Sequence, residues 1–246
     1  MKAMIFAAGL GTRLKPLTDT IPKALLPIGG KTLLEWQLTK IKNAGISDVV
    51  INIHHFPKQI VDFCNCNQSF GMNIRFSDES DMLLETGGGL KKAESLLTDE
   101  NSDEPILVCN VDILSNIDLR ALMSAHNPSD LATIVVSERE TQRYFLFDDT
   151  LRLQGWTNIK TEEIRLSKQR ESICELRKLA FSGMHIVSPR IFSLMQPYPD
   201  KFSITDFYIN TCSKESIKGY IPQDYKMMDI GKIEHLLEAE VFAQTL

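Results

Sequence analysis

The sequence predicts an α/β fold of three layers, with a mainly parallel central sheet and helices on both of its faces. Two observations predict it. Short apolar runs alternate with helical patterns through the first half of the chain, and those runs are continuous, as in strands that are buried on both faces. With 246 residues, of which 43% are hydrophobic and 24% charged, the chain is able to bury one large core.

In the first half, each of the first four expected strands is followed by a helix or a helical turn. The strands are expected at residues 3–7, 48–53, 74–76, 106–109 and 131–137. The helices are expected at residues 33–44, 57–63, 86–97 and 117–126. Thr32 and Glu35 have the spacing of a capping box, which predicts where the first helix begins. Crossovers between parallel strands are expected to be right-handed.

The pattern loosens after Ser137. A hairpin is expected from the apolar residues 144–147 and 151–153, because the polar segment between them is short. Residues 180–187 are expected to form a strand, and Gly183 inside it suggests a bulge.

Three helices are expected near the end of the chain, two at residues 191–195 and 204–212 and one at the C-terminus. The last helix is expected to bury a stripe made of Ile233, Leu236, Leu237 and Val241. Trp36 and Phe181 are expected in the core. We expect a single domain over residues 1–246, with a loosely packed insertion around residues 138–180.

Composition and charge exclude several classes of function. The formal net charge is −5 and no basic stripe is interleaved with aromatic residues, so no nucleic-acid partner is expected. No apolar run approaches the ~18 residues of a membrane span, and residues 3–10 are expected to give a buried strand rather than a signal peptide. The five cysteines include no CxxC pair, which argues against a zinc site. We expect a cytoplasmic protein with mostly buried cysteines.

A glycine loop follows the first strand, at the end of the strand where open α/β sheets bind ligands. Gly9 and Gly11 allow a tight turn that aims several backbone N–H groups at one point. Thr12 adds a hydroxyl and Arg13 adds a forked cation suited to phosphate. The dinucleotide-binding fingerprint is excluded, because its third glycine is replaced by Leu14.

Other positions carry residue types that bind phosphates or metals. Asp112 follows the fourth strand and Asp229 precedes the last helix, so each carboxylate is able either to bind Mg²⁺ or to cap a helix. Lys23 lies in an extended stretch between two prolines. Residues 86–89 place three glycines at a helix start, which suits either close approach to a ligand or a flexible loop. The neighbouring His54 and His55 point to opposite faces and are not expected to share a metal.

Two segments of the chain resemble the signature of the sugar-phosphate nucleotidyltransferases, also called nucleotide-sugar pyrophosphorylases. They are MIFAAGLGTRLKPLT at residues 4–18 and PKALLPI at residues 22–28. The similarity runs over essentially the whole chain. Residues 84–89, 181–183 and 229–231 are most similar to the small bacterial members that act on N-acetylmuramate 1-phosphate.

The resemblance implies a Rossmann-like nucleotidyltransferase fold and a reaction. Members of the family join a nucleoside triphosphate to a sugar 1-phosphate, with Mg²⁺ as cofactor, and release pyrophosphate. Residues 1–137 would form the nucleotide-binding half and residues 138–246 the sugar-binding half. The expected partners are those two small molecules, with no membrane and no nucleic acid, and the protein would be a monomer or a small homo-oligomer.

Matched residue by residue, the resemblance assigns roles to specific positions. The loop that wraps the triphosphate matches Ala8, Gly9, Gly11, Thr12 and Arg13. The loop near the nucleoside or the sugar matches Thr86, Gly87 and Gly88, and Gly183 matches a glycine of the sugar pocket. Arg13 and Lys23 match the cations beside the reacting phosphates, which makes them the catalytic candidates. Asp112 and Asp229 match the two metal ligands.

Two departures from the family pattern keep alternatives open. Val111 stands where relatives have glycine in the metal motif, and residues 144–147 differ on the sugar side. The resemblance to the small bacterial members makes UTP with N-acetylmuramate 1-phosphate the leading pair, for a role in the cell wall. GTP with mannose or heptose 1-phosphate and CTP with phosphocholine are the alternatives. A non-catalytic nucleotide-sugar-binding regulatory module and an unrelated α/β protein, such as a dehydrogenase or methyltransferase, are the other classes.

Overall fold

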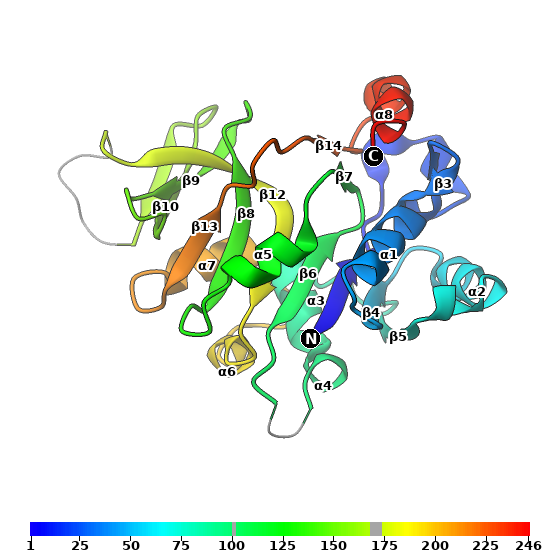
Figure 1. Cartoon of the computed structure of the whole chain (residues 1–246), viewed down its shortest axis with the longest axis horizontal. Coiled ribbons are helices and arrows are strands. Elements are labelled where there is room, and N and C mark those ends of the chain that lie inside the picture. Colours follow the sequence, from blue (N-terminus) through cyan, green and yellow to red (C-terminus); the bar gives the residue numbers. More distant parts are fainter. Residues whose placement is uncertain (100–101, 168–173) are drawn as a thin grey trace.

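A central sheet of ten strands crosses the whole molecule in the computed structural model, which describes residues 1–99, 102–167 and 174–246 (Figure 1). The strand order is β11-β10-β9-β12-β6-β1-β4-β5, and β8 and β13 extend the sheet beside β12. The strands are β1 (Lys2–Phe6), β4 (Asp48–Ile53), β5 (Asn73–Asp78), β6 (Ile106–Asn110), β8 (Ala132–Ser137), β9 (Arg143–Phe147), β10 (Leu153–Asn158), β11 (Glu163–Leu166), β12 (Arg177–Val187) and β13 (Ile217–Tyr220). Two small ribbons pair β2 (Pro27–Ile28) with β3 (Lys31–Thr32) and β7 (Ile113–Ser115) with β14 (Met227–Asp229).

Helices cover both faces of the sheet. They are α1 (Leu33–Asn43), α2 (Pro57–Cys66), α3 (Glu85–Lys92), α4 (Glu94–Leu97), α5 (Leu119–Ala125), α6 (Ile191–Met195), α7 (Ile204–Thr211) and α8 (Leu236–Ala243). Short 3₁₀ turns lie at Thr12–Leu14, Leu17–Asp19, Lys23–Leu25, Gln68–Gly71 and Ile233–His235. Among the described residues, no helix is both long and apolar enough to traverse a bilayer.

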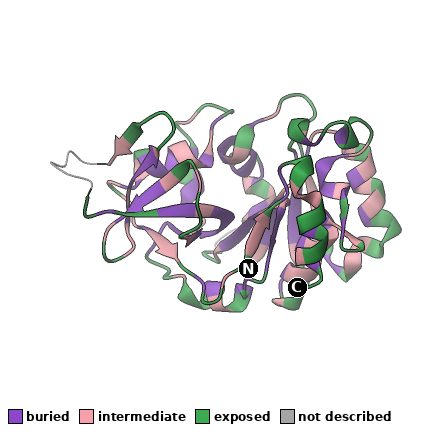
Figure 2. Cartoon of the chain, turned by 90° about the horizontal axis from the view of Figure 1, so that it is seen from above, coloured by how far each residue is buried: buried purple, intermediate pink, exposed green. Residues whose placement is uncertain are grey.

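Two separate hydrophobic cores form, one on each face of the sheet. Ala3 and Ile5 of β1 face a core made with α1, α2, α5 and α8. Met4, between them, faces the other core, made with α3, α4, α6 and α7. This alternation along a strand buried on both sides confirms the three-layer α/β class and explains why the first apolar run is continuous. Figure 2 shows buried residues concentrated along the strands.

The two halves of the chain join the sheet differently. β1 runs parallel to β4 and β6, and β4 runs parallel to β5. β12 is antiparallel to β6, β8 and β9. A hairpin forms as expected, but its second strand, β10, begins at Leu153, where the expected strand ends. The register of β12 shifts between Phe181 and His185, where Gly183 has a left-handed φ of +70°, so the bulge is confirmed.

The prediction of a loosely packed insertion around residues 138–180 is wrong for its described residues. β9 and β10 are full members of the ten-stranded sheet. Phe145, Phe147, Leu153 and Trp156 are buried in the second core. The hairpin is held by pairing with β12 and by apolar packing, neither of which its mixed local sequence indicates.

The predicted apolar stripe of the last helix is also wrong. Leu237 is 82% exposed and Val241 66% exposed, whereas Ala239 and Ala243 are buried. A Cβ atom at Gly29 would lie 2.5 Å from the Cβ of Ala243, so α8 approaches the β2–β3 turn too closely for a large side chain. Small residues therefore face the core.

Several smaller expectations have mixed outcomes. The Thr32 hydroxyl accepts a hydrogen bond from the Glu35 amide at 3.1 Å, so the predicted cap is confirmed. Trp36 is only half-buried, and its indole N–H donates to the carbonyl of Ile28. Three cysteines are buried as expected, but Cys66 and Cys174 are exposed.

Candidate active site

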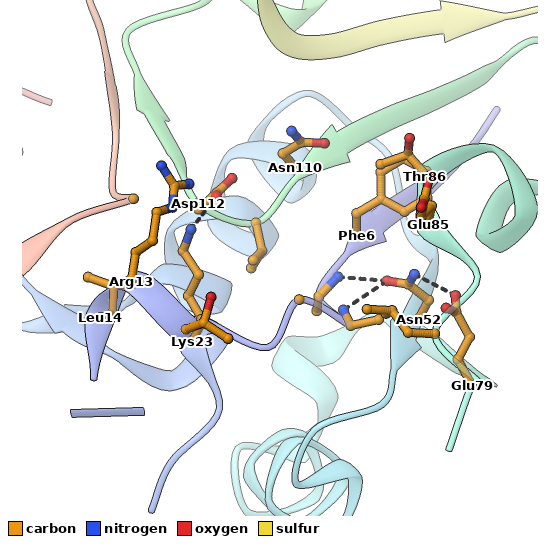
Figure 3. Close-up of a pocket in the computed structure, with 18 residues that line it drawn as sticks. Phe6, Arg13, Leu14, Lys23, Asn52, Glu79, Glu85, Thr86, Asn110 and Asp112 are labelled. Carbon is orange, nitrogen blue, oxygen red and sulfur yellow. Dashed lines mark hydrogen bonds and ion pairs between the residues drawn. The ribbon is translucent and has the colours of Figure 1, made fainter. Parts of the chain in front are cut away.

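A cavity of about 320 Å³ opens at the carboxyl ends of β1, β4 and β6 (Figure 3). We call it the loop cavity, because the glycine loop after β1 forms one wall. Its lining consists of Phe6, Ala7, Ala8, Gly9, Gly11, Thr12, Arg13, Leu14, Lys23, Asn52, Glu79, Leu83, Glu85, Thr86, Asn110, Val111, Asp112 and Gly231. The cavity therefore brings together the loop, both predicted cations and one of the two predicted metal ligands.

The glycine loop has a backbone that requires Gly11. This residue is left-handed, with φ +64°. A Cβ atom here would lie 2.7 Å from Cγ2 of Thr18, whose hydroxyl donates to the Gly11 carbonyl at 2.8 Å. Thr12 and Arg13 follow on the cavity wall. The loop is thus held in a tight turn that leaves its next side chains facing the cavity.

A buried polar network anchors the start of this loop. The side-chain oxygen of Asn52 accepts hydrogen bonds from the amides of Ala7 at 2.6 Å and Ala8 at 3.3 Å. Its amide group donates to Oε1 of Glu79 at 2.7 Å, and Oε2 of Glu79 accepts from the amide of Leu84 at 3.1 Å. The amide of Ala8 is therefore committed to Asn52, although Ala8 lines the cavity. Sequence reasoning missed this pair, which has no local motif.

Asp229 is the last residue of β14, and Asp112 immediately precedes β7, the other strand of the same small ribbon. Asp229 pairs with Ile113 across β7 and β14, and the amide of Ile230 donates to the carbonyl of Asp112 at 2.9 Å. Partial burial of the carboxyl group, then repulsion from Asp112, raise the pKa of Asp229. The strand pairing and this hydrogen bond bring the two carboxylates to one site.

The cations complete this carboxylate site. Lys23 is 8% exposed and forms an ion pair with Asp112. A Cβ atom at Gly231 would lie 3.0 Å from Asp229 Oδ1 and 3.1 Å from Arg13 Nη2, so the glycine leaves room for both groups. In the described part of the chain no cluster of three or more His, Cys, Asp or Glu could hold a metal. Two carboxylates fit Mg²⁺ instead, which takes its remaining ligands from phosphates and water.

Val111 does not disturb this arrangement. Its side chain is buried in the first core, and its amide donates to the carbonyl of Phe6 at 3.1 Å. The backbone φ of Val111 is not in the left-handed region, so no glycine is needed at this position.

The predicted role of Gly87 and Gly88 needs correction. Both amides donate to the carbonyl of Phe202, at 2.9 and 3.1 Å. Cβ atoms at these positions would lie 2.4 Å from the Phe202 ring and 1.9 Å from the Asp200 carbonyl oxygen. The two glycines therefore allow α3 to pack against residues 200–202, and it is Thr86, not they, that lines the loop cavity.

A second cavity, of about 640 Å³, adjoins β9–β12. We call it the arginine cavity, because Arg139, Arg143 and Arg165 line it. Arg165 is neutralised by Asp206, at 2.7 Å, and by Glu163. Asp229 also lines this cavity, so the carboxylate site lies between the two cavities.

Two predictions on the sugar side are corrected by this cavity. Phe181 is half-buried and lines the cavity instead of lying in the core. Gly183 was expected to line the sugar pocket, but among the described residues the lining of the arginine cavity includes Phe181 and not Gly183. A Cβ atom at Gly183 would lie 2.9 Å from Asn110 Nδ2, so this glycine leaves room for a side chain that lines the loop cavity.

The fold and the cavity at this edge of the sheet define an α/β protein whose ligand site lies at the carboxyl ends of its parallel strands. Within that class, the chain belongs to the Nucleotidyl transferase family, whose model matches residues 2–150.

Known relatives include two N-acetylmuramate alpha-1-phosphate uridylyltransferases. One, from Neisseria meningitidis serogroup B, is 46% identical over 121 residues, which is 49% of this chain and 51% of the relative. The chain thus matches about half the length of that protein. The other, from Caulobacter vibrioides, is 29% identical over 97% of this chain and 95% of the relative.

A solved structure supports the fold. A UDP-glucose pyrophosphorylase complexed with UDP-glucose superimposes with a TM-score of 0.77 at 20% identity, over 99% of this chain and 98% of that one.

Proposed function

We propose that the protein transfers the uridylyl group of UTP to N-acetylmuramate 1-phosphate and releases pyrophosphate, with Mg²⁺ as cofactor. The observation that carries the reaction class is the meeting of Arg13, Lys23, Asp112 and Asp229 where the loop cavity adjoins the arginine cavity. The identity of the base rests on the two uridylyltransferase relatives.

The reaction needs little covalent chemistry from the protein. An oxygen of the sugar phosphate attacks the α-phosphorus of UTP, and the bond from that phosphorus to the bridging oxygen of the β-phosphate breaks. The electron pair leaves with pyrophosphate. The attacking phosphate is already ionised at neutral pH, so no side chain has to remove a proton. Catalysis then consists of alignment and of neutralising the charge of the phosphates.

The residues of the loop cavity divide these tasks. The loop from Gly9 to Thr12 orients the triphosphate, and Arg13 and Lys23 neutralise its charge. Asp112 and Asp229 would hold Mg²⁺. When bound, the ion supplies a positive charge that polarises the phosphate oxygens and aligns the two reactants.

The arginine cavity supports an acidic sugar. In the described chain Arg143 has no carboxylate partner, although it lines the cavity. Within the described residues, Arg139 donates a hydrogen bond to the carbonyl of Phe181 and forms no ion pair. N-acetylmuramate carries a lactyl carboxylate that mannose and glucose lack, and a free guanidinium is a suitable partner for it. On this proposal residues 1–137 bind mainly the nucleotide and residues 138–246 mainly the sugar.

The test is pyrophosphate release with Mg²⁺, across four nucleoside triphosphates, with a panel of sugar 1-phosphates and with phosphocholine. The proposal expects release with UTP and N-acetylmuramate 1-phosphate, and at least tenfold less with N-acetylglucosamine 1-phosphate. A guanylyl- or cytidylyltransferase would prefer another pair. Stabilisation by a nucleotide without any release would instead identify a regulatory binding module.

The proposed reaction belongs to cytoplasmic nucleotide-sugar biosynthesis that feeds the cell wall. The protein is proposed to act as a monomer or a small homo-oligomer. Light scattering after size-exclusion chromatography measures that state directly.

A further inference from the structure

Glu85 has a backbone conformation that is unusual for its residue type. Its φ is +62°, in the left-handed region that glycine adopts most easily. It is the first residue of α3. Strained residues of this kind persist only when their surroundings fix them, and they are concentrated at functional sites.

The neighbours of Glu85, and not its own side chain, fix this backbone. The amide of Leu84 donates to the buried Glu79, and the carbonyl of Leu84 accepts from the amide of Phe202 at 3.3 Å. On the other side, the amide of Gly87 donates to the carbonyl of Phe202. A glycine at position 85 would meet the same backbone with less strain. The glutamate side chain therefore needs another explanation.

The carboxylate of Glu85 stands where the two cavities meet. Among the described lining residues, Glu85 is the one that the loop cavity and the arginine cavity share. The residue is exposed, and in the described chain its side chain has no hydrogen bond or ion pair. Figure 3 shows it at the start of α3, beside Thr86 and across the cavity from Arg13 and Lys23.

We infer that Glu85 is a specificity-determining residue that accepts hydrogen bonds from neutral donors, hydroxyl or amide N–H groups, where the nucleotide and the sugar meet. The inference rests on the proposed function, in which both substrates occupy the adjoining cavities. A carboxylate repels phosphate, so the phosphates are expected beside Arg13 and Lys23. The groups that remain to face Glu85 are the ribose hydroxyls and the hydroxyl or acetamido groups of the sugar. Hydrogen bonds to a charged acceptor are about twice as strong as neutral ones.

The test compares Glu85→Gly with wild type and with Asp224→Gly. Asp224 is a matched control, since it is acidic, exposed and left-handed with φ +48°, and lines neither cavity. Both glycine variants relieve backbone strain, so each should raise the melting temperature by about 2–4 °C or leave it unchanged. Only Glu85→Gly should lower kcat/KM, by about tenfold or more. Glu85→Gln keeps an acceptor oxygen and should recover part of the loss.

Substrate analogues identify the donor. If the ribose supplies it, 2′-deoxy-UTP or 3′-deoxy-UTP should cost wild type more than it costs Glu85→Gly. If the sugar supplies it, the same difference should appear between N-acetylglucosamine 1-phosphate and glucose 1-phosphate. Unchanged kcat/KM in Glu85→Gly, or an equal loss with every analogue and no recovery in Glu85→Gln, would overturn the inference.

Ligand binding separates this inference from the proposed function. A wild type that releases no pyrophosphate contradicts the proposed function. The stabilisation by UTP or by UDP-N-acetylglucosamine can still be measured in that case. A smaller ligand-induced rise in melting temperature for Glu85→Gly than for Asp224→Gly would support the role of Glu85, and equal rises would refute it.

Discussion

The sharpest stability prediction concerns Asn52, which connects the ends of β1 and β4 to Glu79. Asn52 is 3% exposed and Glu79 is fully buried. Asn52→Ala removes the acceptor of two backbone amides and the donor to a buried carboxylate. Each unsatisfied group costs about 1–3 kcal/mol, and water from the loop cavity offsets part of this, so we expect a loss of about 3–5 kcal/mol.

Urea unfolding followed by far-UV circular dichroism measures this loss. Asn52→Asp gives a second, pH-dependent readout, because it keeps the acceptor but places a carboxylate against Glu79. The variant should be less stable at pH 8 than at pH 5.5, where the two carboxylates are able to share a proton. Adding Glu79→Gln, which restores a donor, should remove most of that pH dependence. A loss below 1 kcal/mol in Asn52→Ala, with unchanged UTP binding, would refute the reasoning.

Three further predictions test the site and the core. Asp112→Asn and Asp229→Asn should each lower turnover at least tenfold, while circular dichroism shows an intact fold. The rise in melting temperature caused by Mg²⁺ should disappear in both variants. Near-normal turnover in both would remove the metal assignment. Lys23→Ala should also impair pyrophosphate release, and a lower melting temperature with normal turnover would make Lys23 structural. Burial lowers the pKa of His185 from 6.5 to about 3, so the unfolded state binds a proton that the folded state excludes. The free energy of unfolding should therefore fall by about 2–3 kcal/mol between pH 6.5 and 4.5 from this residue. Replacing His185 and its partner Tyr208 by Phe should reduce that slope, as urea titrations at several pH values would reveal.

The structure agrees best with those sequence inferences that depended on short segments. The strand before Gly9, the cap at Thr32 and the bulge at Gly183 each follow from residues within a few positions of one another. The prediction for the glycines of α3 was wrong because the same local pattern serves two structural purposes. The three glycines of α3 suit a ligand loop and close helix packing equally well, and only the contact with Phe202 distinguishes these uses.

The sequence by itself therefore determined the order of the longer strands and of the helices, the loop that faces the cavity and the two candidate carboxylates. Tertiary structure alone decided that Asn52 meets Glu79, that Asp229 lies beside Asp112, and that Glu85 stands between the two cavities. The physical reason is the range of the interactions. Periodicity and capping act within one or two turns of chain, whereas these polar contacts join side chains from separate elements whose approach is set by how the two cores pack against the sheet.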